Sequence, residues 1–138
     1  MLKTILLGLL ITGTSLAKDI TFSLESIDKS LASVSSHAQS WPPKFESDAE
    51  RQMFEGELKN VIALLDAAVS QNPDDAVLLS RHGLAHALGH NLDFPGSAEK
   101  AIHSYEHLLA LHPDNPRANY DYGAFLCGTA VGGEKAIK

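Results

Sequence analysis

Histidines are the only side chains in this 138-residue chain whose spacing suggests chemistry. His82, His86 and His90 are four residues apart, so on a helix they would lie along one side. His103 and His107 repeat the spacing. Two neutral imidazoles at positions i and i+4 can share a zinc ion. One hypothesis is therefore a metal-binding or hydrolytic protein that uses the stripe of His82, His86 and His90.

Other signals for an enzyme are weaker. Cys127 is the only cysteine, so no disulfide can form within the chain, and we expect a small packed thiol. No serine lies in a Gly-x-Ser-x-Gly motif. Asp74, Asp75 and Asp114 lie at proline breaks, where acidic residues favour turns and helix starts. The sequence predicts no catalytic residue, no cofactor and no enzymatic activity.

The first 17 residues have the pattern of a signal peptide. Lys3 gives a positive start, residues 5–11 (ILLGLLI) are apolar, and Ser15 and Ala17 place small residues before a cleavage position. The apolar run is much shorter than the roughly 20 residues of a membrane-spanning helix. We therefore expect a periplasmic or secreted protein that begins near Lys18 and has no stable membrane insertion.

The acidic charge of the chain argues against polyanionic partners. The formal net charge is −6, and it becomes −7 without residues 1–17, which contain one lysine and no acidic residue. An acidic protein does not favour nucleic acid or an anionic membrane. The remaining length is that of one domain.

Apolar residues recur at three- and four-residue steps, which indicates helices, and no segment has the alternation of a strand. Ser47 and Glu50 have the spacing of a capping box. The sequence therefore predicts an all-α fold, with helices over residues 20–38, 47–71, 76–90, 98–111 (capped by Ser97) and 117–127. Residues 18–45 would be an N-terminal helix and a proline-rich linker around a packed Trp41, and residues 46–138 would be the main domain.

One pattern occurs twice in the second half of the chain. Residues 72–84 (NPDDAVLLSRHGL) are answered by residues 112–124 (HPDNPRANYDYGA), with Gly83 matching Gly123. A helical unit repeated at 20–50 residues indicates a solenoid, in which each unit buries its apolar face against its neighbours. Both glycines are expected where two helices of a hairpin pack closely.

These residues resemble the tetratricopeptide repeat (TPR) family. That repeat has a large residue and glycine on its first helix, then alanine, an aromatic residue and alanine on its second, and it ends in proline. The matching residues are His82, Gly83, Ala101, Tyr105, Leu108 and Pro113 in one unit, Tyr122, Gly123 and Ala136 in the next, and Val61, Leu65, Ala68 and Pro73 in the preceding half-unit. The resemblance implies antiparallel hairpins stacked as a short solenoid over residues 46–138.

Two features depart from the family pattern. Pro73 and Pro113 are 40 positions apart, whereas the family repeat has about 34, so about six residues are added around residues 90–96. The long helix before Pro73 also lacks a clear partner helix in the sequence.

The resemblance implies a non-enzymatic interaction module or scaffold that binds a protein or peptide on the concave face formed by its first helices. Arginine and tyrosine are typical interface anchors. The protein-binding residues nominated in this way are Arg81, Leu84, Arg117 and Tyr120. The family's Lys and Asn pattern for gripping a terminal carboxylate is not present at Ser80 and Leu84, so a C-terminal peptide is not expected.

The same alignment gives the histidines a structural role. His82 and His86 occupy positions that pack against the partner helix, and no Glu follows His82 as in an HExxH motif. His103 and His107 would face solvent. On this interpretation the chain holds no metal.

The end of the chain predicts an unfinished hairpin. Residues 134–138 begin a second helix and stop after about one turn, which is too short to be stable alone. The apolar residues of the preceding helix, Tyr120, Tyr122, Phe125 and Leu126, would then be only partly covered. The chain is therefore expected to be a fragment of a longer repeat protein or to self-associate through this incomplete repeat.

Overall fold

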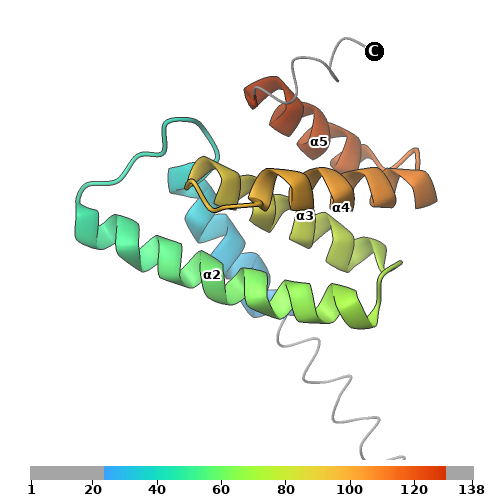
Figure 1. The fold of residues 1–138 in the computed structure, drawn as a ribbon, viewed down its shortest axis with the longest axis horizontal. Helices are drawn as coiled ribbons and strands as arrows, with labels where there is room; N and C mark the ends of the chain where they lie inside the picture. The colour runs from blue at the N-terminus through green and yellow to red at the C-terminus, as the bar shows by residue number, and fades with distance from the viewer. Residues whose placement is uncertain (1–23, 130–138) are drawn as a thin grey trace, which may run out of the picture.

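The computed structural model describes residues 24–129, which are helical apart from their connections. An N-terminal helix covers residues 24–38, and it is followed by α2 (Asp48–Gln71), α3 (Ala76–Asn91), α4 (Ser97–Leu111) and α5 (Pro116–Gly128). The chain reverses direction at each connection, so successive helices pack as antiparallel hairpins (Figure 1). Residues 24–129 contain no strand. The all-α fold predicted from the sequence is confirmed.

The two proline turns of the duplicated pattern have the same geometry. Asn72, which follows α2, has φ −135° and ψ 71°, and His112, which follows α4, has φ −136° and ψ 74°. Asp75 and Asn115 then cap α3 and α5, and their side chains accept hydrogen bonds from backbone amides of the first turn. The sequence repeat therefore corresponds to a repeated local structure.

The N-terminal helix supplies the partner helix that the sequence left unassigned. Its buried residues share one core with α2 and α3, so it forms the first hairpin together with α2. This shared core includes Ile27, Leu31, Val34 and Ala38 from the N-terminal helix, Phe54, Leu58, Val61 and Leu65 from α2, and Ala85 and Leu88 from α3. The side chain of Asn91 at the end of α3 also donates to the carbonyl oxygen of Ala38 at 2.8 Å.

The starts of α2 and α4 differ in how they are capped. The Ser47 hydroxyl accepts from the Glu50 amide at 3.1 Å, as the capping box predicts, while the Glu50 carboxylate accepts from the amide of Glu46. The prediction that Ser97 caps α4 is wrong. Gly96, at φ 72°, takes that position because glycine adopts the left-handed region without strain, and Ser97 is buried inside the helix.

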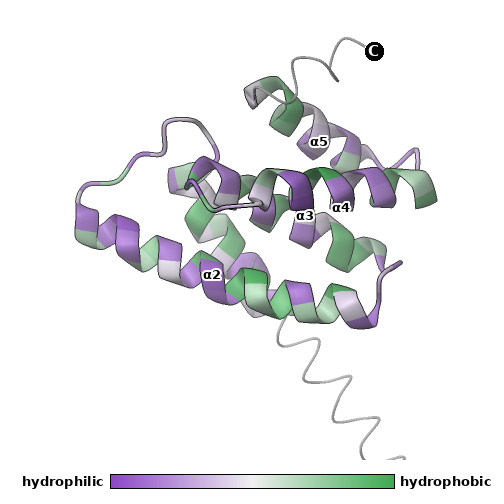
Figure 2. Cartoon of the chain, viewed as in Figure 1, coloured by the Kyte–Doolittle hydropathy of each residue, from purple (hydrophilic) through white to green (hydrophobic). Residues whose placement is uncertain are grey.

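Hydrophobic and hydrophilic residues alternate around the helices in Figure 2, as expected when each helix buries one side. A second set of buried residues, Leu79, Leu108 and Ala118, joins α3, α4 and α5. A third set, Ala101, Tyr105 and Phe125, joins α4 to α5. The hairpin of α3 and α4 therefore lies at the centre of the fold.

The two glycines of the repeat differ in their surroundings. A Cβ atom at Gly83 would lie 2.7 Å from Cε1 of Tyr105, so α3 and α4 approach closely at this residue. At Gly123 a Cβ atom would meet no atom of residues 24–129 within 4 Å. Close packing, predicted for both glycines, is confirmed for Gly83. For Gly123 the predicted partner helix lies outside the described residues.

None of the helices described between residues 24 and 129 combines the length and apolar character of a membrane-spanning segment. The predicted signal peptide (residues 1–17) and the predicted start of a further helix (residues 134–138) lie outside the described residues.

Candidate functional site

A groove lies between the N-terminal helix, α3 and α5. Its polar part is lined by Asp28 and Leu31 from the N-terminal helix, Arg81 from α3, and Arg117 from α5. Its aromatic part is lined by residues that include Trp41, Ala87, Tyr105, Tyr120 and Ala124. The two parts share Gln39, Leu84 and Asp121, so they form one continuous surface, which we call the groove.

The four residues nominated from the sequence as protein-binding all lie on this groove. Arg81 and Arg117 line the polar part, Tyr120 lines the aromatic part, and Leu84 belongs to both. Tyr120 is 73 % exposed, which is high for an aromatic residue. The structure therefore places all four residues on one surface.

Both arginines of the groove already pair with carboxylates. Arg81 donates through two nitrogens to Asp28 at 2.6 and 2.7 Å, and this pair links α3 to the N-terminal helix. Arg117 donates to Asp121, four residues along α5, at 2.6 Å. Because the charges are balanced in pairs, the groove does not require a strongly charged ligand.

The aromatic part of the groove combines exposed rings with a buried hydroxyl. Trp41 is 62 % exposed, so the prediction that it packs within the linker is wrong. The hydroxyl of Tyr105 is buried and has no hydrogen-bond partner among residues 24–129, and burial raises the pKa of Tyr105. Leu84 and Ala87 add apolar side chains to the lining of this part of the groove.

A second polar site lies away from the groove, between α2, α3 and α4. Nε2 of His82 lies 2.7 Å, and Nε2 of His86 lies 3.1 Å, from the same oxygen of Asp66, Oδ1. The second oxygen of Asp66 accepts from Lys100 of α4 at 2.9 Å. We call Asp66, His82 and His86 the Asp–His cluster.

Serine hydroxyls hold the other ring nitrogens of this cluster. Nδ1 of His82 lies 2.6 Å from the Ser104 hydroxyl, and Nδ1 of His86 lies 3.3 Å from the Ser97 hydroxyl. Both histidines and both serines are buried. The two rings are therefore fixed on one side by α4 and on the other by Asp66 of α2.

Burial and hydrogen bonding act in opposite directions on the ionisation of the cluster. Burial alone would raise the pKa of Asp66, but hydrogen bonds from Lys100, His86 and His82 outweigh it and lower that pKa to about 2. Burial lowers the pKa of His82 and of His86, although the Asp66 carboxylate opposes this shift. At neutral pH the cluster therefore holds one carboxylate and two neutral imidazoles.

The structure divides the histidine stripe that the sequence suggested. His82 and His86 belong to the cluster, whereas the ring of His90 contacts the edge of Phe125, with ring centroids 5.7 Å apart. His103 is exposed and stacks on His107, which binds Asp74 at 2.8 Å. The burial of His82 and His86 against neighbouring helices is confirmed, and the three-histidine set is replaced by two histidines and Asp66.

Sequence reasoning missed Asp66. Its signal was present, because Asp66 lies between Ile62 and Val69 at four- and three-residue steps, on the side of α2 that packs against the core. A carboxylate at such a position needs a buried partner. No neighbouring residue in the sequence identifies that partner, because His82 and His86 come from the next helix.

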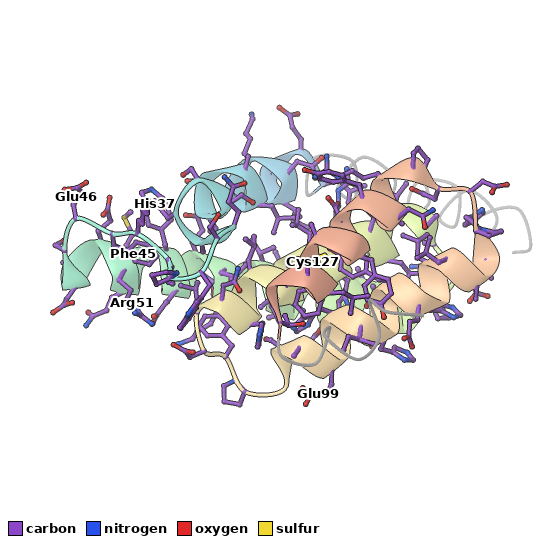
Figure 3. All side chains as sticks on the ribbon, turned by 90° about the horizontal axis from the view of Figure 1, so that it is seen from above. His37, Phe45, Glu46, Arg51, Glu99 and Cys127 are labelled. Atoms are coloured by element: carbon purple, nitrogen blue, oxygen red, sulfur yellow. The ribbon has the colours of Figure 1, made fainter. Side chains whose placement is uncertain are left out.

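Cys127 does not take part in either site. It lies on α5, labelled in Figure 3, and it is exposed. The expectation that its thiol is packed is wrong, because the side chains of α5 that face the core are Ala118 and Phe125. Glu99, on the first turn of α4, points away from the body of the molecule in the same figure.

In comparisons with known proteins, no family model, no curated protein and no solved structure matches this chain.

Proposed function

We propose that this chain is an exported interaction module of the tetratricopeptide repeat type, which binds a protein or peptide partner in the groove and catalyses no reaction. The observation that carries the proposal is the position of Arg81, Leu84, Arg117 and Tyr120. These four residues were nominated as a binding face from the repeat alignment alone, and they all line the groove.

The repeat assignment is supported by two features of the fold. The turns before α3 and α5 have nearly identical backbone angles, as expected of successive units of a solenoid. Tyr105 of α4 also packs against Gly83 of α3, which pairs the glycine and the aromatic residue of the TPR pattern.

The chemistry of the groove favours a peptide with an apolar or aromatic anchor residue. Trp41 and Tyr120 are exposed rings on the same part of the groove, and Leu84 provides an apolar surface there. Aromatic residues in such positions often dominate the binding energy of an interface. The paired arginines and carboxylates of the polar part would then contact the peptide backbone and its polar side chains.

Selection of binding peptides from a displayed random library tests this proposal. We expect the selected peptides to share an apolar or aromatic residue and to lose at least about tenfold in affinity on Tyr120→Ala or Trp41→Ala, the loss of roughly 1.4 kcal/mol that is typical of an anchor. Met53→Ala on α2 is the matched control, because Met53 is 58 % exposed and does not line the groove. Peptides that bind Tyr120→Ala and Trp41→Ala as tightly as the parent protein would contradict the proposal.

Export and assembly are separate parts of the proposal. Mass spectrometry of the protein from its native cell should find a chain that begins near Lys18, whereas an intact Met1 in the soluble exported fraction would contradict export.

Self-association through the C-terminal repeat is tested by light scattering. The structure leaves less apolar surface on α5 than the sequence suggested, because Phe125 is buried and Tyr122 donates to Glu106 at 2.9 Å.

A further inference from the structure

We propose that the Asp–His cluster is a binding site for a divalent transition-metal ion, with Zn²⁺ as the ion that fits its donors best. The site consists of Nε2 of His82, Nε2 of His86 and the carboxylate of Asp66, whose ligand atoms all lie within 4.8 Å of one another. It does not share a residue with the groove. The proposal therefore stands or falls independently of peptide binding.

The first support is the convergence of the donors. The two Nε2 atoms lie 2.7 and 3.1 Å from one carboxylate oxygen of Asp66. Around a tetrahedral Zn²⁺ with bonds of about 2.0–2.2 Å, neighbouring ligand atoms are about 3.3 Å apart. Each Nε2 atom and the Asp66 oxygen therefore need to separate by about 0.2–0.6 Å. Asp66 can make this movement, because its side chain is 37 % exposed while the histidines are held in the core.

The second support is the set of groups behind the ligands. Histidines that bind a metal donate their other ring N–H to a neighbouring acceptor, which fixes the ring. Here the Nδ1 atoms of His82 and His86 face the hydroxyls of Ser104 and Ser97. A hydroxyl can donate or accept. In the metal-free protein each Nε2–H donates to Asp66 and each Nδ1 accepts from its serine. With an ion bound, each Nε2 is a ligand and each Nδ1–H donates to the same serine, so no buried nitrogen loses its partner.

The donor set selects among ions. Two imidazoles and one carboxylate suit Zn²⁺ and similar transition-metal ions, whereas Mg²⁺ and Ca²⁺ prefer oxygen ligands and Cu⁺ prefers sulfur. Three protein ligands leave at least one position for water. A shallow pocket lined by Asp66, His82, Lys100 and His103 gives an ion a path from solvent to the cluster.

Lys100 is the group that competes with the ion. Its ammonium lies 2.9 Å from Oδ2 of Asp66, so it repels a cation and occupies one carboxylate oxygen. The Lys100 side chain is 53 % exposed and can move into solvent when the ion enters. Lys100→Met should therefore tighten metal binding, an effect opposite to that of every ligand substitution.

The test is isothermal titration calorimetry of the metal-free full chain with Zn²⁺, with Mg²⁺ as the comparison ion. We expect one equivalent of Zn²⁺ to bind at micromolar concentration or below. Asp66→Asn, His82→Gln and His86→Gln should each weaken binding by at least about tenfold. Circular dichroism identifies the variants that keep the fold. In the unsubstituted protein, long-range ¹H–¹⁵N NMR should show metal ligation at Nε2 of two histidines, so the proposal can be tested even if a variant does not fold.

The matched control is the other pair of histidines at i and i+4. His103 and His107 stack with ring centroids 6.3 Å apart on the surface of α4, where a metal can bind adventitiously. The variant His107→Gln breaks this pair and leaves His103, which lines the pocket beside the cluster, in place. It should keep Zn²⁺ affinity within about twofold, which is well below the effect of losing a ligand. The proposal would be overturned if no Zn²⁺ bound at about 100 µM, a concentration far above the dissociation constant expected for a protein zinc site. Loss of binding in His107→Gln but not in His82→Gln or Asp66→Asn would overturn it too.

Discussion

The hairpin of α3 and α4 and the single helix α5 begin with the same sequence pattern but are packed differently. Gly83 of α3 lies against the ring of Tyr105, so that an added Cβ would come within 2.7 Å of it. The matching Gly123 of α5 is exposed, and no atom in the described part of the chain lies within 4 Å of the corresponding Cβ position. The difference arises because α4 covers α3, whereas no helix among residues 24–129 covers the Gly123 side of α5 in the same way.

Two glycines that match in the sequence repeat therefore need not have the same structural role. Glycine is required where a second helix approaches closely, and among residues 24–129 α4 supplies that helix for Gly83. The same turn geometry before α3 and α5 follows from local residues alone, so it is present in both units. Within the described residues the local features of the repeat are therefore duplicated, whereas the close packing at glycine occurs in the hairpin of α3 and α4 alone.

The largest effect is expected in the first hairpin, where the N-terminal helix packs against α2 and α3. Leu31 of the N-terminal helix is 3 % exposed and packs in one core with α2 and α3. Leu31→Ala should lower the free energy of unfolding by about 2–5 kcal/mol, because it leaves a cavity in that core. Urea denaturation measures the change. The exposed Ser33 on the same helix gives the control Ser33→Ala, and equal stability of the two variants would show that this helix does not belong to the core.

The next effect concerns the close approach in the complete hairpin. Gly83→Leu should lower the free energy of unfolding by about 1–3 kcal/mol or more, because the new side chain would have to displace Tyr105 from between α3 and α4. Thermal and urea denaturation both measure this change. A variant that unfolds together with the parent protein would contradict the packing at Gly83 and the repeat register built on it.

The smallest effect is expected at the matching position of α5. Gly123→Leu should leave stability unchanged or raise it by up to about 1 kcal/mol, because leucine favours a helix more than glycine does and its Cβ meets no atom of residues 24–129. The same denaturation experiment applies, and Gly83→Leu is its counterpart. A loss as large as that of Gly83→Leu would mean that another helix covers α5 in the intact protein.

Much of the fold could be predicted from the sequence because local patterns determine it. The bounds of α2, α3 and α5 follow from proline breaks and from capping by Ser47, Asp75 and Asn115. The start of α4 was missed by one residue, because Gly96 in a left-handed conformation replaces a capping side chain. The pairing of the N-terminal helix with α2 was missed because it depends on contacts between residues far apart in the sequence. Leu31, for example, packs in one core with residues of α2 and α3.

The candidate sites were predictable to different extents. The groove residues could be nominated because the position of a residue in the repeat determines which side of a first helix it occupies. The Asp–His cluster could not be assembled in the same way, since Asp66 and Lys100 come from helices on either side of His82. The exposure of Trp41 was also missed, because the sequence of an irregular linker does not determine whether its tryptophan faces the core or the solvent.

Photocrosslinking in the native cell tests most directly whether a partner binds in the groove. A photoreactive amino acid at position 124, which lies in the groove, is compared with the same amino acid at position 53, on the exposed side of α2. Both substitutions leave Trp41, Leu84 and Tyr120 in place. Binding in the groove predicts a discrete crosslinked protein for position 124 that is absent for position 53 and is lost when Tyr120→Ala is added. Crosslinks that are the same at both positions, or that persist with Tyr120→Ala, would contradict binding in the groove.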